Sequence, residues 1–270
     1  MRTSADTASS SVGRVLRDSG VGDARSARQD DILRTLQEAR QVDVAELAQR
    51  FGVSGMTIRR DLAELDEAGQ LHRVHGGATI RRAPAYGSRA STRAQEKAAI
   101  ARVVAQLVEP DAAVGIDTGT TCHAVAAELA HRNDLTVVTN ALNPAITIRE
   151  GGSRVIVLGG LLTPEFSLVS PGSAQEPPQV HLDLLILGCG GLSIERGITY
   201  FDPTEVEVRR MLASRADRVL VAADHTKFNR NMAMVLGPLD LIDTLVTDQA
   251  PPEPLGTAFA AAGAEVVVAS

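Results

Sequence analysis

Tryptophan is absent from the 270-residue chain, and two tyrosines and five phenylalanines are its only other aromatic residues. A core without large rings has to be built from alanine, valine, leucine and isoleucine. Long apolar runs are absent too, because stretches such as "VLVAA" and "LLILGC" stop far short of the roughly 20 residues that span a bilayer. The first residues hold no uninterrupted apolar stretch of the kind found in a signal peptide. The sequence therefore predicts a soluble globular protein with no membrane partner.

Cysteine is scarce, with only Cys122 and Cys189 in the chain. Two cysteines make neither a disulfide framework nor a zinc cluster, which is typical of a protein of the reducing cytoplasm. Cys122 with His123, and the pair His72 and His75, lack the further ligands that a metal ion needs. We therefore expect a cytoplasmic protein without a metal site.

Lysine is nearly absent, since Lys97 and Lys227 stand against 25 arginines. Lysine is a compact point charge and arginine a wide planar fork, so a tight site for one phosphate oxygen or one carboxylate can distinguish them. Both lysines are therefore unusual, although a chain in which arginine replaces most lysines could keep two lysines at any positions by chance. Neither belongs to a G-K-[ST] motif, and "GCGGLS" has Ser193 where a dinucleotide fingerprint needs its third glycine. We therefore expect no nucleotide cofactor.

The formal net charge of −6 is unevenly spread along the chain. Residues 1–82 hold 13 arginines and 12 acidic residues, whereas residues 83–270 hold 14 basic and 21 acidic residues. A DNA-binding surface would therefore have to be a local patch rather than a global charge.

Composition and periodicity divide the chain into four stretches. Residues 1–25 are rich in Ser, Gly, Asp and Arg and predict a mobile tail. Residues 26–80 predict a small domain of three helices and a hairpin with a Gly-Gly turn. Residues 81–92 have the proline, glycine and serine content of a linker. Residues 93–270 predict a larger α/β domain.

Apolar strands and helices alternate in this larger domain. The predicted strands are "AVGID", "LTVVTN", "RVIVLGG", "LLILGC", "RVLVAAD", "TLVTD" and "EVVVA". One helix is expected over "RAQEKAAIARVVAQLV", and others near 121–131, 203–214 and 254–262. Short, continuous apolar strands between helices are typical of a mostly parallel sheet covered on both faces.

The small domain contains two short helices joined by "FGVS", which match a helix-turn-helix. Ile58, Leu62 and Leu65 share one face of the second helix and predict its core side. The side chains expected to reach DNA are Met56, Thr57, Arg59 and Arg60, preceded by the N-cap Ser54. Arginine can read guanine through two hydrogen bonds, and hydroxyls hold phosphates. Arg73 and His75 would form a wing beside the DNA; a helical bundle with merely solvated arginines is the alternative.

The stretch "VAELAQRFGVSGMTIRRDLAELDEAGQLHRVHGGA" resembles the winged helix-turn-helix of the DeoR family of bacterial transcription regulators. The family pattern is V-S-x-x-T-I-R-R-D-L followed by R-x-x-G-G-A. The matching residues are Ser54, Thr57, Ile58, Arg59, Arg60, Asp61, Leu62, Arg73, Gly76, Gly77 and Ala78. The resemblance implies double-stranded operator DNA as a partner. Gly55 departs from the family, which often has a side chain facing DNA there, so base readout is expected to fall to Met56 and the arginines.

The second half resembles the effector domain of the same family, because "EKAAIA", "IDTGTT", "VVTN", "VLGG", "GCGGL", "DHTKF" and "VTD" follow one another in the family's order. That domain is similar in fold to ribose-5-phosphate isomerase and the CoA transferases. The resemblance implies a phosphorylated sugar as effector, held by Asp117, Thr118, Gly119, Thr120, Thr121, Asn140 and Lys227. Successive amides at a helix N-terminus can hold a phosphate, although an ordinary strand-to-helix turn has the same sequence.

A sugar-phosphate isomerase is the alternative function, because the fold is shared with enzymes. Aldose–ketose isomerisation needs a carboxylate base. In the isomerases a carboxylate-bearing loop follows the strand that corresponds to "LLILG", whereas residues 188–191 of this chain read Gly-Cys-Gly-Gly. Asp117 and Glu205 are the carboxylates that remain. We therefore expect a regulator without catalytic residues.

The sequence as a whole predicts a cytoplasmic repressor of a sugar-catabolic operon that a phosphorylated sugar releases from DNA. We expect a homodimer or homotetramer, because one short recognition helix reads too few base pairs and symmetric half-sites supply the rest.

Overall fold

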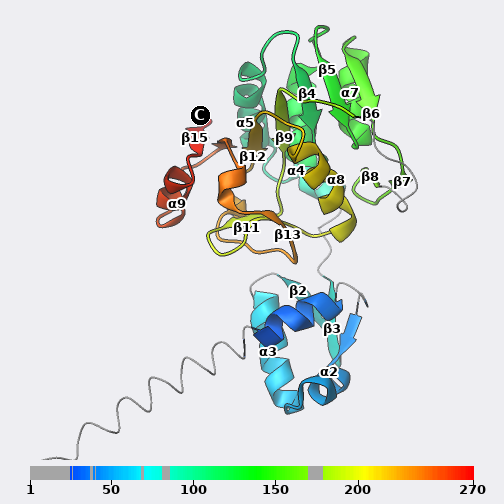
Figure 1. The fold of residues 1–270 in the computed structure, drawn as a ribbon, viewed down its shortest axis with the longest axis vertical. Coiled ribbons are helices and arrows are strands. Elements are labelled where there is room, and N and C mark those ends of the chain that lie inside the picture. The colour runs from blue at the N-terminus through cyan, green and yellow to red at the C-terminus, as the bar shows by residue number, and fades with distance from the viewer. Residues whose placement is uncertain are drawn as a thin grey trace, which may run out of the picture. The chain divides into compact units, whose positions relative to one another are not determined.

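The computed structural model describes residues 25, 27–36, 39, 41–67, 70–80, 86–169 and 179–270. These residues form two compact units, which divide the chain into residues 1–81 and residues 82–270 (Figure 1). The tail predicted over residues 1–25 lies outside the described residues except for Arg25. Within the described ranges, no helix combines the length and the apolar character that crossing a membrane requires.

The N-terminal unit packs short helices around an aliphatic core. Residues 27–36 are helical, and α2 (Val44–Phe51) and α3 (Gly55–Glu67) follow. Their apolar faces meet in a cluster that contains Ile32, Leu36, Val44, Leu47, Ile58, Leu62 and Leu65. The core side of α3 is therefore the side that its helical spacing indicates.

Local sequence sets the ends of α2 and α3. Asp43 caps α2, because its carboxylate accepts two amides of the first turn at 2.7 and 3.4 Å. Gly52 ends α2 with a φ of 64°, a left-handed conformation that glycine adopts without steric cost. Ser54 Oγ then accepts the Thr57 amide at 3.1 Å and starts α3. These caps fix the turn between the two helices.

The wing is a sheet of three antiparallel strands, of which the sequence predicted only two. Its strands lie in the order β1 (Gln41–Asp43), β3 (Gly77–Ile80) and β2 (Leu71–Val74). The turn uses His75 and Gly76 rather than both glycines, because Gly77 already belongs to β3. A Cβ atom on Gly77 would lie 1.9 Å from the carbonyl oxygen of Val42 in β1. This close approach of two strands explains why the position needs glycine.

The C-terminal unit is built on a seven-stranded parallel sheet, which confirms the predicted α/β class. In spatial order its strands are β15 (Glu265–Val268), β14 (Thr244–Thr247), β12 (Val219–Ala222), β9 (Leu184–Leu187), β4 (Ala113–Ile116), β5 (Thr136–Thr139) and β6 (Arg154–Val157). Each lies within one of the predicted strand segments.

Successive side chains of these strands alternate between two cores. Leu184 and Ile186 point into one core, together with residues of α5 (Ala94–Gln106), α6 (Thr120–Leu129) and α7 (Leu142–Glu150). Leu185 and Leu187 point into the other core. The elements that cover this second face are α8 (Pro203–Ala213), α9 (Leu255–Ala261) and the antiparallel sheet of β10 (Gly191–Ser193), β11 (Gly197–Tyr200) and β13 (Met234–Gly237). Burial on both faces explains the unbroken apolar character of the strands.

Several short elements were not predicted. They are α4 (Tyr86–Ser91), α7, the β10–β11–β13 sheet, the hairpin of β7 (Leu161–Leu162) and β8 (Leu168–Val169), and the 3-10 turns η1 (His225–Lys227) and η2 (Leu239–Leu241). Helix α4 lies inside residues 81–92, where the sequence indicated a linker. Its sequence "YGSRAS" has weak helix propensity, so contacts with the rest of the unit decide its conformation.

The strand order reverses at one place in the sheet. The chain runs from β4 outward to β5 and β6, and then returns to β9 on the other side of β4. Beyond β9 it continues outward to β12, β14 and β15. In open parallel sheets, ligands bind at such a switch point, outside the carboxyl ends of the strands. The ends of β4 and β9 are therefore the place where the fold favours a ligand.

The approach of β1 to β3 gives a stability prediction. Gly77→Ala should destabilise the N-terminal unit by about 2 kcal/mol, because β1 must move away from the added methyl group. The matched control is Gly55→Ala at the start of α3, where the nearest atom would lie 3.5 Å away. That variant should be unchanged or up to about 1 kcal/mol more stable. Urea unfolding followed by hydrogen exchange of the α2 and α3 amides measures both, and equal stabilities would contradict the prediction.

Candidate functional site

The exposed face of α3 carries the side chains that the sequence predicted for DNA contact. Met56 is 70% exposed while Ile58 beside it is fully buried. Arg59 and Arg60 are both exposed, and Arg60 Nε lies 3.5 Å from a carboxylate oxygen of Glu64 on the next turn. An exposed pair of this kind is weak, so it does little to hold the Arg60 side chain in place.

The other predicted DNA contacts differ in how far they are already engaged. Ser54 Oγ caps α3 and lies 2.9 Å from Thr57 Oγ1, so these two hydroxyls bind each other. Arg73 in β2 and His75 in the turn are exposed. Asp61, part of the motif but without a predicted role, is buried and accepts a 2.6 Å hydrogen bond from Arg28. It therefore anchors α3 to the helix of residues 27–36.

The predicted effector loop follows β4 at the switch point. Gly119 has a φ of 110° and is the N-cap of the ten-residue helix α6. Thr118 Oγ1 donates to the carbonyl oxygen of Glu165, in the β7–β8 turn, at 3.1 Å. Asn140, after β5, is buried, and its side-chain amide donates to Leu168 O at 3.1 Å. Asn140 therefore holds the β7–β8 hairpin against the end of β5.

A buried network of charges lies directly behind this loop. Arg209 Nε donates to Asp117 Oδ2 at 2.9 Å, and its Nη1 donates to Glu205 Oε2 at 3.0 Å. The other carboxylate oxygen of Glu205 accepts from Ser167 Oγ at 2.6 Å. The guanidinium also lies 4.0 Å above the ring centre of Tyr200. One arginine of α8 thus binds the end of β4 and, through Glu205, the β7–β8 hairpin.

Burial shifts the proton affinities of this network. Burial raises the pKa of Asp117, and the neighbouring Arg209 offsets only part of that shift. Burial lowers the pKa of Arg209, but the charges of Asp117 and Glu205 outweigh it and raise the pKa above its usual value. Arg209 therefore stays charged. Within the described residues Asp117 Oδ1 is buried without a hydrogen-bond partner, so one acceptor remains at the edge of the predicted site.

Lys227 lies in η1, just after the carboxyl end of β12. One carboxylate oxygen of the preceding Asp224 accepts hydrogen bonds from the amide of Thr226, at 3.0 Å, and from its hydroxyl. Burial raises the pKa of Asp224, but the hydrogen bonds from Thr226 and the charge of Lys227 together bring it below the usual value. Within the described part of the chain, no hydrogen bond or ion pair engages the Lys227 ammonium.

Lys97, the chain's other lysine, lies near the same place, which the sequence did not indicate. It is 7% exposed on α5, and its ammonium donates to the carbonyl oxygens of Thr92, at 2.6 Å, and of Arg89. Burial lowers the pKa of Lys97; the negative charge of Asp224 opposes that shift, whereas Lys227 adds to it. The two lysines are thus close enough to act on each other.

Helix α4 lies beside the effector loop and contributes another cation. Arg89 forms an ion pair with Glu165, the residue whose backbone binds Thr118. Tyr86 Oη lies 3.0 Å from His123 Nδ1 in α6, and its ring meets Phe166 edge-on at 5.3 Å. Positive side chains therefore surround the end of the sheet on three elements: α4, α5 and η1.

Two family models match consecutive parts of the chain. The DeoR-like helix-turn-helix domain matches residues 28–83, and the DeoR C terminal sensor domain matches residues 92–249. The chain belongs to the DeoR family of transcription regulators. The glycerol-3-phosphate regulon repressor of Escherichia coli strain K12 is 34% identical over 233 residues, which cover 84% of this chain and 92% of the relative. The HTH-type transcriptional regulator GolR of Listeria innocua is 33% identical over 248 residues, with coverage of 90% and 98%.

Solved structures of low sequence identity resemble part of this DeoR-family regulator. Ribose 5-phosphate isomerase A from Neisseria gonorrhoeae aligns with 15% identity and a TM-score of 0.37, over 49% of this chain and 52% of the isomerase. The family assignment rests on the two models and the sequence relatives.

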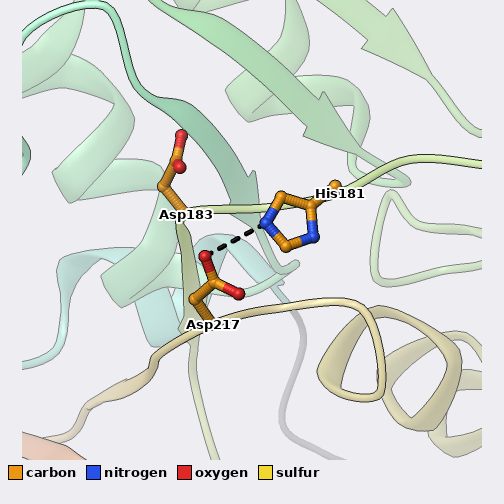
Figure 2. Close-up of side chains that lie close together, drawn as sticks. All are labelled: His181, Asp183 and Asp217. Atoms are coloured by element: carbon orange, nitrogen blue, oxygen red, sulfur yellow. Dashed lines mark hydrogen bonds and ion pairs between the residues drawn. The ribbon is translucent and has the colours of Figure 1, made fainter.

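A third cluster of polar residues lies at the opposite, amino-terminal edge of the sheet. His181, Asp183 and Asp217 are exposed and near one another (Figure 2). His181 Nε2 lies 3.0 Å from Asp217 Oδ2, and Asp183 Oδ2 accepts the Ala113 amide at 2.7 Å. These contacts hold the starts of β9, β12 and β4 together, which accounts for the cluster without a ligand.

The buried network predicts unequal costs for two neighbouring arginines. Arg209→Met leaves two carboxylates without their cation and should lower the free energy of unfolding by about 3–5 kcal/mol. Arg210→Met removes an exposed pair with Glu207 and a 2.6 Å hydrogen bond to the Val235 carbonyl oxygen, and should cost about 1–2 kcal/mol. Urea denaturation of both variants measures the difference, and a similar loss for each would contradict a structural role of the network.

Proposed function

We propose that this DeoR-family regulator represses a sugar-catabolic operon in the cytoplasm and leaves its operator when a phosphorylated sugar binds. The proposal rests on Lys227 and the Thr118–Thr121 loop, which follow the carboxyl ends of β12 and β4 in one parallel sheet, and on the electrostatic interaction of Lys227 with Lys97. The name of the Escherichia coli relative, a repressor of the glycerol-3-phosphate regulon, supports both the repression and a phosphorylated effector.

Lys227 and the α6 N-terminus would hold the phosphate. The amides of residues 119–121 begin α6, where the helix dipole favours a negative charge. Lys227 supplies an ammonium that no described residue occupies. Lys97 already donates to two carbonyl oxygens, so it would act through its charge rather than through a direct bond. The unpartnered Asp117 Oδ1 would accept a sugar hydroxyl.

The site favours sensing over catalysis. An isomerase needs a carboxylate that can take a proton from carbon. Glu205 has both oxygens engaged, by Ser167 and by Arg209, and Asp117 is paired with the same arginine. Burial also raises the pKa of the Cys189 thiol to about 12, so it is a poor nucleophile near neutral pH.

DNA binding would use the exposed face of α3 with the wing beside it. Met56, Arg59 and Arg60 would face base edges, and Ser54, Thr57, Arg73 and His75 would face the backbone or minor groove. One such helix reads only a few base pairs, so we propose that two or four copies bind symmetric half-sites.

The first test concerns base readout by α3. Arg60→Ala should weaken binding to operator DNA by about 1–3 kcal/mol and have a smaller effect on scrambled DNA, because a base contact is lost. Titrations of both DNAs at two salt concentrations measure this. An equal loss on both would make Arg60 a phosphate contact, and no binding by the wild type would overturn the regulator proposal.

The second test concerns the phosphate. Lys227→Met keeps the length of the side chain without its charge, so effector affinity should fall at least about tenfold, while operator affinity stays near wild type. Lys227→Arg keeps the charge and should lose part of the response. A thermal-shift screen of sugar phosphates, beginning with glycerol 3-phosphate, identifies the ligand, and calorimetry then compares the variants. An unchanged dissociation constant in Lys227→Met would refute the phosphate contact.

A further inference from the structure

The ion pair between Arg89 and Glu165 joins two segments that are far apart in the chain. Arg89 lies on α4, and Glu165 lies in the turn between β7 and β8. Both side chains are only about a quarter exposed, at 23% each. An ion pair this shielded from water is stronger than a fully exposed one. It ties α4 to the β7–β8 turn.

The same turn is bound to the effector loop. The carbonyl oxygen of Glu165 accepts the Thr118 hydroxyl at 3.1 Å. The backbone of Glu165 thus contacts the Thr118–Thr121 loop directly, and its carboxylate is separated from that loop by no more than the length of the Glu165 side chain. Arg89 also adds to the lowering of the Lys97 pKa, as Lys227 does, so the three cations share one electrostatic neighbourhood. Glu165 is the anion paired with Arg89, one of these three cations.

One backbone position at these contacts is strained. Phe166, next to Glu165, has a φ of 59°. Bulky residues rarely adopt the left-handed region and do so when surrounding contacts hold them there. The contacts present are Phe166 with Tyr86 and Glu165 with Arg89. If they open, the β7–β8 turn can relax.

We propose that Arg89 is an effector contact that Glu165 occupies until the effector's phosphate displaces it. This proposal rests on the proposed function and deepens it. Phosphate and the Glu165 carboxylate repel each other, so a dianion bound between Lys227 and the α6 N-terminus would draw Arg89 away from Glu165. Release of the pair would free α4. Because residues 82–85 alone separate α4 from the DNA-binding unit in the chain, its position would bear on operator binding.

The exchange predicts opposite effects for its two partners. Glu165→Gln removes the competing charge, so affinity for inorganic phosphate should rise about fivefold or more, while operator affinity without effector should fall by a similar factor. Arg89→Gln removes the cation, so phosphate affinity should fall, yet operator affinity should also fall because the same pair is broken. A merely structural ion pair predicts that both variants change phosphate affinity in the same direction.

The two tyrosines of the chain, Tyr86 and Tyr200, provide a readout that needs no ligand. In fluorotyrosine-labelled protein, the Tyr86 signal, assigned through Tyr86→Phe, should move in Glu165→Gln without phosphate, toward its position in phosphate-bound wild type. Glu207→Gln is the matched control, because Glu207 forms an exposed pair with Arg210 on α8. It should leave the phosphate affinity, the operator affinity and the Tyr86 signal unchanged. Thermal unfolding checks that each variant is folded.

The outcomes separate this proposal from the proposed function. If wild type binds phosphate and sugar phosphates but Glu165→Gln binds them no more tightly, the exchange is wrong and the sensor function stands. An unmoved Tyr86 signal in Glu165→Gln likewise overturns the exchange. If wild type binds none of these anions at any concentration tested, the phosphate-sensing function itself fails.

Discussion

The ion pairs of Arg209 are the interaction on which the candidate site depends. Burying a guanidinium and two carboxylates costs several kcal/mol per charge, and the cost is recovered only when their geometry and further hydrogen bonds satisfy them. Arg209 meets this condition through Asp117, Glu205 and the Tyr200 ring. The network fixes α8, the end of β4 and the β7–β8 hairpin relative to one another. The loop that begins α6 is therefore attached to a rigid base, which lets its amides and hydroxyls keep their directions.

The two edges of the sheet show how position decides the role of polar residues. At the amino-terminal edge, His181, Asp183 and Asp217 bind one another or a neighbouring strand and remain exposed. At the carboxyl edge, Lys97 and Lys227 come from distant parts of the chain, yet the charge of Lys227 helps to lower the pKa of Lys97. The difference follows from topology, because the strand order reverses between β4 and β9, and ligands of open parallel sheets bind outside the carboxyl ends at such a point. The presence of charged residues alone would not have indicated which of the two clusters is the candidate binding site.

A regulator of this kind needs its two units to be stable separately and linked energetically. Each unit has its own aliphatic core. Binding of an effector to one unit can change DNA affinity only if the two ligands favour different arrangements of the chain. Helix α4 is suited to that role, because it begins the effector unit in the chain and contacts the rest of that unit through the side chains of Tyr86 and Arg89. Elements held by few contacts are the ones that move at small cost.

The sequence by itself determined the class of the fold, the seven parallel strands and the core side of α3. These features depend on local periodicity and on burial on both faces of a sheet. Both leave a pattern of apolar residues that can be recognised within one short segment of the sequence. The cap residues Asp43 and Ser54 are local for the same reason. The motif residues also indicated the family of the chain, and the rarity of lysine indicated Lys97 and Lys227 as unusual positions. Nothing in a short window, however, encodes which strand lies beside which.

Only the tertiary structure decided the pairing of Arg209 with Asp117, which are 92 residues apart in the chain, and the electrostatic interaction of Lys97 with Lys227. Asn140 and Asp117 matched a binding motif, yet the structure engages one with Leu168 and the other with Arg209. The helix at residues 86–91 could not be predicted from the sequence either, because "YGSRAS" has a low helix propensity. Contacts made by Tyr86, Arg89 and Lys97 stabilise its conformation. Local pattern reports which face of a segment is buried, whereas the partner of a buried charge depends on how the chain returns through space.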